Sequence, residues 1–176
     1  QEYRRLEGLR KAGRAIILPL NFPRPPNVGT AEAALEASLR ELMHWDIAPE
    51  NPARLARAGV PIAFTTNGME GRGGFLGAVR KAVTRGLSKN DALAALTVTP
   101  AGLFGVADGL GTIEQGKIAS FFVASGDIFA EDTKITETWV AGEPYRIVLP
   151  PLEVLRGRCN FHIASAIPAT HVMHTA

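Results

Sequence analysis

The stretch Ala53–Gly68, with the sequence ARLARAGVPIAFTTNG, decides the fold of this chain. Leu55 and Ala56 mark the apolar face of a short predicted helix. Gly59 ends that helix, because a residue with positive φ commonly follows a helix end. Val60–Thr65 is then a compact run of apolar, β-branched and aromatic residues, which is typical of a buried parallel strand.

Small polar residues follow this strand and form the candidate site. Thr65, Thr66 and Asn67 end the strand, and Gly68 permits a tight exit. In parallel α/β folds, ligands and catalytic groups lie at the carboxyl ends of strands. The alternative is an ordinary turn between a strand and a loop, and the local sequence leaves both interpretations open.

Helical and strand patterns alternate upstream of this stretch. A helix is predicted over Glu2–Ala12, with Gly13 after it, and an apolar strand over Ala15–Leu20. Asn21–Gly29 is a proline-rich loop that either lines a site or is only a rigid connector. Thr30 caps a helix predicted from Ala31 to Trp45, whose apolar stripe contains Leu35, Leu39, Leu42 and Met43. This alternation predicts a parallel sheet with helical crossovers.

The pattern changes in the second half of the chain. Helices are predicted from Phe75 to Gly86 and after the Ser88 cap, followed by a turn that Thr99-Pro100 opens and in which Leu103-Phe104 packs inward. Beyond Ala107, glycines separate short alternating runs, which predict a small β unit. The runs are Thr112–Glu114, Ile118–Ala124, Ile135–Val140 and Pro144–Leu149.

Composition limits the class of protein. With 176 residues and 46% apolar content, the chain can bury one ordinary core. Its net charge of +2 gives no basis for a nucleic acid or an anionic membrane as partner, and no apolar run is long enough to span a membrane. Cys159 is the single cysteine, which excludes an internal disulfide and fits a reducing compartment such as the cytoplasm.

Histidines give little support for a metal site in this chain. His44 stands beside Trp45 without a second ligand nearby, so we interpret it as structural. His171 and His174 have a spacing that metal sites can use, but they lie near a chain end, where order is usually low. We therefore expect no metal ligands in this chain.

Three segments together resemble the carboxyl-terminal part of amidohydrolase-superfamily metal-dependent hydrolases, especially the imidazolonepropionase-like branch. Their order and spacing match across about Leu9 to Arg146. The segments are LARAGVPIAFTTN at residues 55–67, GLSKNDAL running to TPA at residues 86–101, and GVAD with GTIEQGKIASFFV at residues 105–123.

The resemblance implies a partial (β/α)₈ TIM barrel with a small β-sandwich segment. Ala15–Leu20 would be the seventh barrel strand and Val60–Thr65 the eighth. Residues 1–108 would belong to the barrel, residues 109–150 to the composite β-sandwich, and residues 151–176 form a tail without an assignment. Such enzymes hydrolyse C–N bonds of small cyclic or peptide-like amides with a hydroxide activated by zinc or another divalent metal.

This sequence departs from the family pattern at its most important position. Asn67 stands where the family has an aspartate that binds metal and accepts the proton from water. An amide cannot act as a general base at neutral pH. Ser120 also replaces a usual aspartate, a change that we interpret as structural. The His-x-His pair that the family carries upstream has no counterpart here.

Two of eight strands cannot close a barrel, so we expect a portion of a longer protein, completed by the remainder of the barrel or by self-association. The chain opens with Gln1 rather than Met, which fits a processed start or a piece. By itself this portion is expected to be inactive.

The alternative is a non-catalytic binding or scaffold domain on a decayed hydrolase fold. An independent small α/β enzyme would need a nucleophile and base pair, which the sequence lacks.

Overall fold

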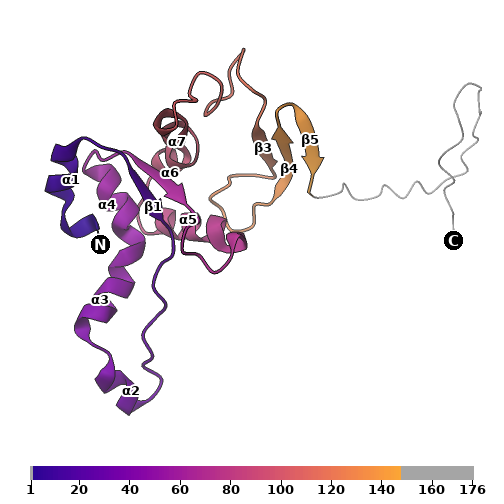
Figure 1. Cartoon of the computed structure of the whole chain (residues 1–176). Coiled ribbons are helices and arrows are strands. Elements are labelled where there is room, and N and C mark those ends of the chain that lie inside the picture. The colour runs from indigo at the N-terminus through magenta and orange to yellow at the C-terminus, as the bar shows by residue number, and fades with distance from the viewer. Residues whose placement is uncertain (1, 148–176) are drawn as a thin grey trace, which may run out of the picture.

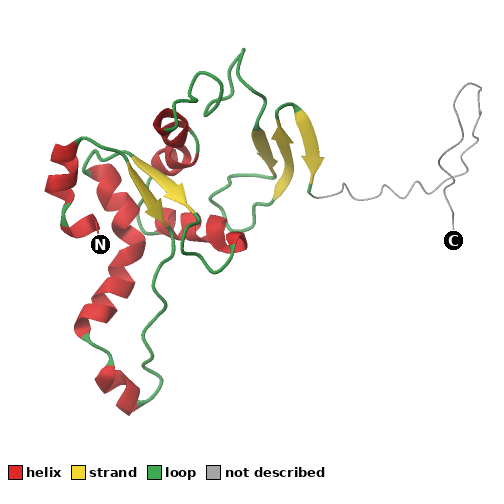
Figure 2. Cartoon of the chain, viewed as in Figure 1, coloured by secondary structure: helices red, strands yellow, loops and turns green. Residues whose placement is uncertain are grey.

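A computed structural model describes residues 2–147, which form helices around a two-stranded parallel sheet and a separate three-stranded antiparallel sheet (Figure 1, Figure 2). No helix in this range has the length and apolar character that a membrane crossing requires. In chain order, the first half contains η1 (Glu2–Arg4), α1 (Leu6–Ala12), β1 (Ile16–Pro19), α2 (Ala31–Glu36), α3 (Leu39–Ile47), η2 (Ala48–Glu50), α4 (Asn51–Arg57) and β2 (Ile62–Thr65). The second half contains η3 (Arg72–Gly74), α5 (Phe75–Thr84), α6 (Lys89–Leu96), α7 (Val98–Leu103), β3 (Phe121–Ala124), β4 (Ile135–Val140) and β5 (Glu143–Arg146).

The predicted parallel pair of strands is confirmed. β1 and β2 run side by side in the same direction, with Ile16 opposite Ile62 and Pro19 opposite Thr65. Gly13 and Gly59, which end the helices before these strands, have the positive φ angles of 60° and 73° that a helix end requires. The decisive stretch therefore folds as helix, glycine and strand.

One face of the parallel sheet is covered, and the other face is open on the β1 side. Leu18 and Leu20 of the β1 segment are buried, and they belong to a core that also contains Leu55 of α4 and Val79 of α5. Ile17 alternates to the opposite face and is 50% exposed. Successive side chains of a strand point to opposite faces, so the second face is open at Ile17, whereas Ala63, the partner of Ile17 on β2, is buried on that face.

The helix predicted from Ala31 to Trp45 is wrong as a single element. The chain is extended at Ala37, and Ser38 starts a new helix, α3, through a capping box with Glu41. Hydrogen bonds from Ser38 hold the pKa of the Glu41 carboxyl below its usual value. The predicted stripe is not buried either, since Leu35 on α2 is 89% exposed.

The turn around Pro100 also differs from its prediction. α7 begins at Val98 rather than at Pro100, and the hydroxyl of Thr97 donates to the carbonyl of Leu93 instead of capping the helix. Leu103 and Phe104 do not pack inward: the side chain of Leu103 is 41% exposed and that of Phe104 is 72% exposed. Apolar character marked these residues as core, but the described part offers no surface to cover them.

The antiparallel sheet confirms the small β unit and has the order β3, β4, β5. Phe121 lies opposite Trp139, and their rings stack with centroids 5.5 Å apart. Ser120 accepts a hydrogen bond of 3.0 Å from the backbone N–H of Ala141 in the turn between β4 and β5, which is a structural role. Thr112–Glu114 forms no strand, and the end of the run Pro144–Leu149 lies outside the described residues.

Arg80 of α5 joins the helical layer to the segment before β4. Its guanidinium donates to three backbone carbonyls, at 3.0 Å to Ile128, 3.3 Å to Glu131 and 2.8 Å to Thr133. Lys89 of α6 adds an ion pair with Asp127, and this hydrogen bond lowers the pKa of the Asp127 carboxyl. Two consecutive helices therefore hold one loop.

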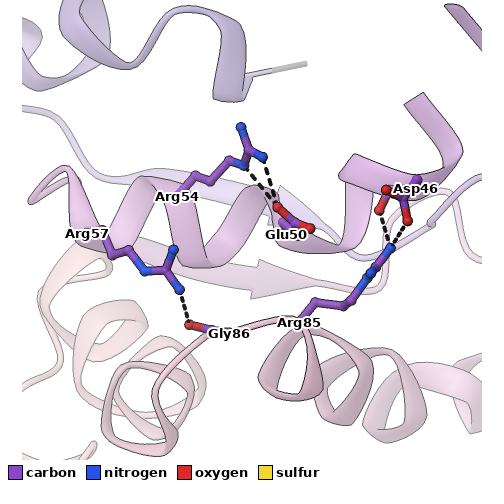
Figure 3. Close-up of polar contacts among 6 residues, drawn as sticks. All are labelled: Asp46, Glu50, Arg54, Arg57, Arg85 and Gly86. Atoms are coloured by element: carbon purple, nitrogen blue, oxygen red, sulfur yellow. Dashed lines mark hydrogen bonds and ion pairs between the residues drawn. The ribbon is translucent and has the colours of Figure 1, made fainter. Parts of the chain in front are cut away.

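A second group of polar contacts fastens α3 and α4 to the turn between α5 and α6 (Figure 3). Arg57 donates to the carbonyl of Gly86 at 3.0 Å, and Arg85 donates to the carbonyl of Asp46 at 2.6 Å. Within the helical segment, Arg54 pairs with Glu50 at 2.9 Å. Two of these contacts end on backbone carbonyls, so they fix the position of the main chain. The third pairs two opposite charges.

Replacing Arg80 by Ala should lower the free energy of unfolding by about 2 kcal/mol, because it removes charge-assisted hydrogen bonds and leaves the partly buried carbonyls of Ile128 and Thr133 unpaired. Urea unfolding followed by circular dichroism measures this. The matched control is Arg40→Ala on exposed α3, which should change stability by no more than about 0.5 kcal/mol. Equal effects of the two substitutions would contradict the role given to Arg80.

Candidate functional site

The carboxyl ends of β1 and β2 meet at one edge of the parallel sheet. Because Pro19 lies opposite Thr65, the chain leaves both strands at the same level. Asn21 follows β1, and its amide nitrogen lies 2.8 Å from the point where Gly68 would carry a Cβ atom. The two loops are therefore in direct contact, and their polar residues form one surface.

The turn after β2 has a defined shape. The Thr65 hydroxyl accepts a hydrogen bond of 3.2 Å from the backbone N–H of Asn67, and the N–H of Met69 donates to the carbonyl of Thr66 at 3.1 Å. Gly68 has φ of 75°, a conformation that L side chains rarely adopt. Thr65 and Thr66 are half-buried, whereas Asn67 is exposed. This geometry presents the Asn67 amide to solvent at the strand ends.

A cleft of about 790 Å³ lies beside these loops. Asn21, Phe22 and Arg24 line it from the β1 side, Gly68 to Gly74 contribute from the β2 side, and Lys81 of α5 completes it. Arg24 pairs with Glu70 across the cleft, and the Lys81 ammonium lies 5.7 Å from the centre of the Phe22 ring. Of the predicted site residues, only Gly68 lines this cleft.

Sequence reasoning missed Asn21, Arg24 and Lys81. The rule that selected Thr65 to Gly68 also applies to Asn21, because Asn21 directly follows the neighbouring strand. The contact between Asn21 and Gly68 places the start of the proline-rich loop beside the turn after β2. Arg24 and Lys81 carry no local signal, because their approach depends on how the loop and α5 pack.

The described residues do not fit a catalytic metal ion. No group of three or more histidine, cysteine, aspartate or glutamate side chains in residues 2–147 lies close enough to hold one. At the strand ends, Asn21 and Asn67 offer only neutral amides, whereas catalytic zinc sites use three histidine, carboxylate or thiolate ligands. No chemical step of this part of the chain is therefore assigned to a metal.

His44 is the one histidine within residues 2–147. The hydroxyl of Tyr3 lies 3.4 Å from Nδ1 of His44, and the two rings stack with centroids 6.5 Å apart. These contacts agree with the structural interpretation of His44. The prediction for His171 and His174, like the one for Cys159, falls outside the described residues.

Comparison with known proteins confirms the family resemblance. The sequence profile of the amidohydrolase family matches residues 50–150. Among solved structures, the chain is similar to an amidohydrolase from Thermotoga maritima MSB8, with a TM-score of 0.63 and 26% identity, over 82% of this chain and 35% of that one. A search of curated proteins found no match.

Two further solved structures are similar in fold alone. One is a prolidase complexed with N-methylphosphonate-L-proline, with a TM-score of 0.57 and 16% identity, over 82% of this chain and 38% of that one. The other is a Xaa-Pro dipeptidase with methionine in its active site, with a TM-score of 0.54 and 17% identity, over 82% and 43%. The chain thus spans less than half the length of each structure.

Replacing Gly68 by Ala should destabilise the fold by about 1–2 kcal/mol, because the methyl group is strained at positive φ and meets Asn21. The matched control in the same loop is Gly71→Ala, where φ is −170° and a Cβ atom meets nothing within 4 Å. Urea midpoints of both variants provide the measurement. A normal midpoint for Gly68→Ala would show that the two loops do not touch.

Proposed function

The chain belongs to the amidohydrolase family, and on that premise we propose that it supplies the last two strand ends of a site that hydrolyses C–N bonds in small amides. The parallel pairing of β1 with β2 carries the proposal, since it brings Asn21 together with the Thr65–Gly68 turn. Ligands of parallel α/β folds bind at this end of the strands. Cyclic or other non-peptide amides are the substrate class that the imidazolonepropionase-like motifs imply.

In this proposal, Asn67 occupies the position of the family aspartate without its chemistry. Its amide nitrogen donates hydrogen bonds and its oxygen accepts them, but neither takes a proton from water near neutral pH. Thr65 holds the backbone of Asn67, while Thr66 and Gly68 shape the surface around it. The chain therefore contributes binding and orientation, and the proton transfer has to come from elsewhere.

The part of the sheet that is open at β1 supports the further proposal that more of the barrel completes this site. Ile17 is half exposed on that face, and the similar solved structures are more than twice as long as the part matched here. Residues 1–108 would contribute to the barrel and residues 109–150 to the β-sandwich. Zinc or another divalent ion of a complete family member would be held by residues outside the described part.

A second candidate is a binding or scaffold domain without catalysis. The neutral amides at both strand ends favour this candidate, because a site that kept its hydrolytic function would need a carboxylate or an imidazole to move protons. The two candidates differ in what an added carboxylate would do.

The 176-residue chain should bind zinc only below stoichiometry and hydrolyse no amide, because its strand ends lack charged ligands. Dialysis against zinc followed by elemental analysis, together with an assay on a panel of N-acyl amino acids and cyclic imides, measures both. Stoichiometric zinc that is lost in Asn67→Ala would refute the proposed incompleteness.

Asn67→Asp distinguishes the two candidates when it is made in the native polypeptide that contains this chain. If the protein is a hydrolase that has lost its general base, the new carboxylate should raise the rate of amide hydrolysis by about a hundredfold, the usual contribution of a positioned general base. The matched control is Asn27→Asp, which adds the same charge in the loop after β1 and still accepts the hydrogen bond from Gly29. No gain over this control would favour the binding module.

A further inference from the structure

The cleft beside the strand ends carries charges that the proposed function does not use. Among the described residues that line it, two have cationic side chains, Arg24 and Lys81, and one has a carboxylate, Glu70. The lining therefore keeps one positive charge. The cleft volume of about 790 Å³ is typical of small-molecule sites, so this charge concerns a small ligand.

The charge that remains belongs to Lys81. Arg24 forms an ion pair with Glu70, so these two side chains neutralise each other. Within residues 2–147, Lys81 has no ion-pair partner, and its ammonium lies 5.7 Å from the centre of the Phe22 ring. An aromatic ring attracts a cation but does not neutralise it. Lys81 is thus held beside the loop after β1 with its charge free for an anion.

Glycines of the loop after β2 and of α5 leave the cleft open. Gly71, Gly73 and Gly77 line it, and a Cβ atom added at any of them would meet nothing within 4 Å. Asn21 and Gly68, at the two strand ends, line the same cleft. One small molecule can therefore contact Lys81 and the strand ends together.

We propose that the cleft binds a carboxylate group of the substrate and that Lys81 is the partner of this carboxylate. The inference rests on the proposed function, because it narrows the substrate to a small amide that carries a carboxylate. One uncompensated charge matches a monoanion, whereas a phosphate group carries nearly two negative charges. A lysine ammonium suits this role, since it is a compact charge with three rotatable donors and needs no fixed geometry.

The remainder of the barrel would not fill this cleft. Its lining comes from the loops after β1 and β2 and from α5, at the carboxyl ends of the strands. In complete (β/α)₈ barrels, this end carries the active site, and the loops after the last two strands frequently bind an anionic group. A completed barrel therefore keeps this surface open to a ligand.

Titration of the ¹⁵N-labelled 176-residue chain, followed by NMR, tests the inference with two probes that differ in charge. N-acetylglycine carries a carboxylate, and N-acetylglycinamide is its neutral counterpart. N-acetylglycine should shift the amide signals of residues 71–77 and bind about fivefold more tightly at low salt, the upper range for a partly exposed ion pair. Equal affinities, shifts that avoid these residues, or no binding of N-acetylglycine at any soluble concentration would overturn the proposal.

Substitutions at Lys81 identify the source of the preference. Lys81→Gln should abolish the preference for N-acetylglycine, and Lys81→Arg should retain it because the charge remains. Lys81 is exposed, so neither change should disturb the fold, which circular dichroism checks. The matched control is Arg72→Gln, which removes a positive charge from η3 in the same loop but does not line the cleft. Equal losses in Lys81→Gln and Arg72→Gln would contradict the role of Lys81.

The ion pair across the cleft gives a further test with the opposite sign. Glu70→Gln removes the carboxylate that occupies Arg24, so it should strengthen binding of N-acetylglycine and leave that of N-acetylglycinamide unchanged. Weaker binding of N-acetylglycine by this variant would overturn the proposal, because it would mean that the cleft does not attract anions through its charge.

Failure of this inference and failure of the proposed function give different results. Binding needs no catalysis, and Asn67 does not line the cleft. A gain of hydrolysis in Asn67→Asp without any preference for N-acetylglycine would refute the carboxylate site alone. A preference that depends on Lys81 without any gain in Asn67→Asp would keep the carboxylate site and favour the binding module.

Discussion

The parallel pairing of β1 with β2 is the constraint on which the rest of this structure depends. Parallel neighbours need a crossover, and here residues 20–61 provide it through α2, α3 and α4. Two short strands are marginal by themselves, so the stability of the pair comes from the helices packed against it, and Leu18, Leu55 and Val79 belong to the buried core that they form together. The same pairing places the two polar loops at one edge, which makes a site possible there.

Features that depend on a few neighbouring residues could be predicted from the sequence. Gly59 and Gly86 end helices because glycine adopts positive φ without steric strain, and both residues have positive φ. Val60–Thr65 has the composition of a buried parallel strand whatever lies around it, so its type was predictable before its partner was known. The break at Ser38 belongs to the same class, since Ser38 and Glu41 form a recognisable capping box, but the apolar stripe across it favoured one continuous helix.

Features that depend on distant partners could not be predicted. Leu35 and Phe104 were assigned to buried surfaces because they are apolar, yet periodicity describes a face without saying what covers it. At the candidate site, the ends of the strands were predictable, but the contact between Asn21 and Gly68 requires the register of the sheet. The role proposed for Asn67 rests on the motif resemblance rather than on its surroundings, because an exposed amide after a strand indicates no chemistry by itself.

Arg80 connects α5 to the segment before β4, and this contact restricts the residue type on α5 but not in the segment. Its three acceptors are carbonyls of Ile128, Glu131 and Thr133, which every amino acid carries. These three hydrogen bonds therefore do not depend on which side chains stand at those positions, provided that the main chain keeps its course. Arg80 has no such freedom, because only a planar guanidinium reaches three acceptors in this arrangement, and a lysine ammonium would leave at least one of them unmet.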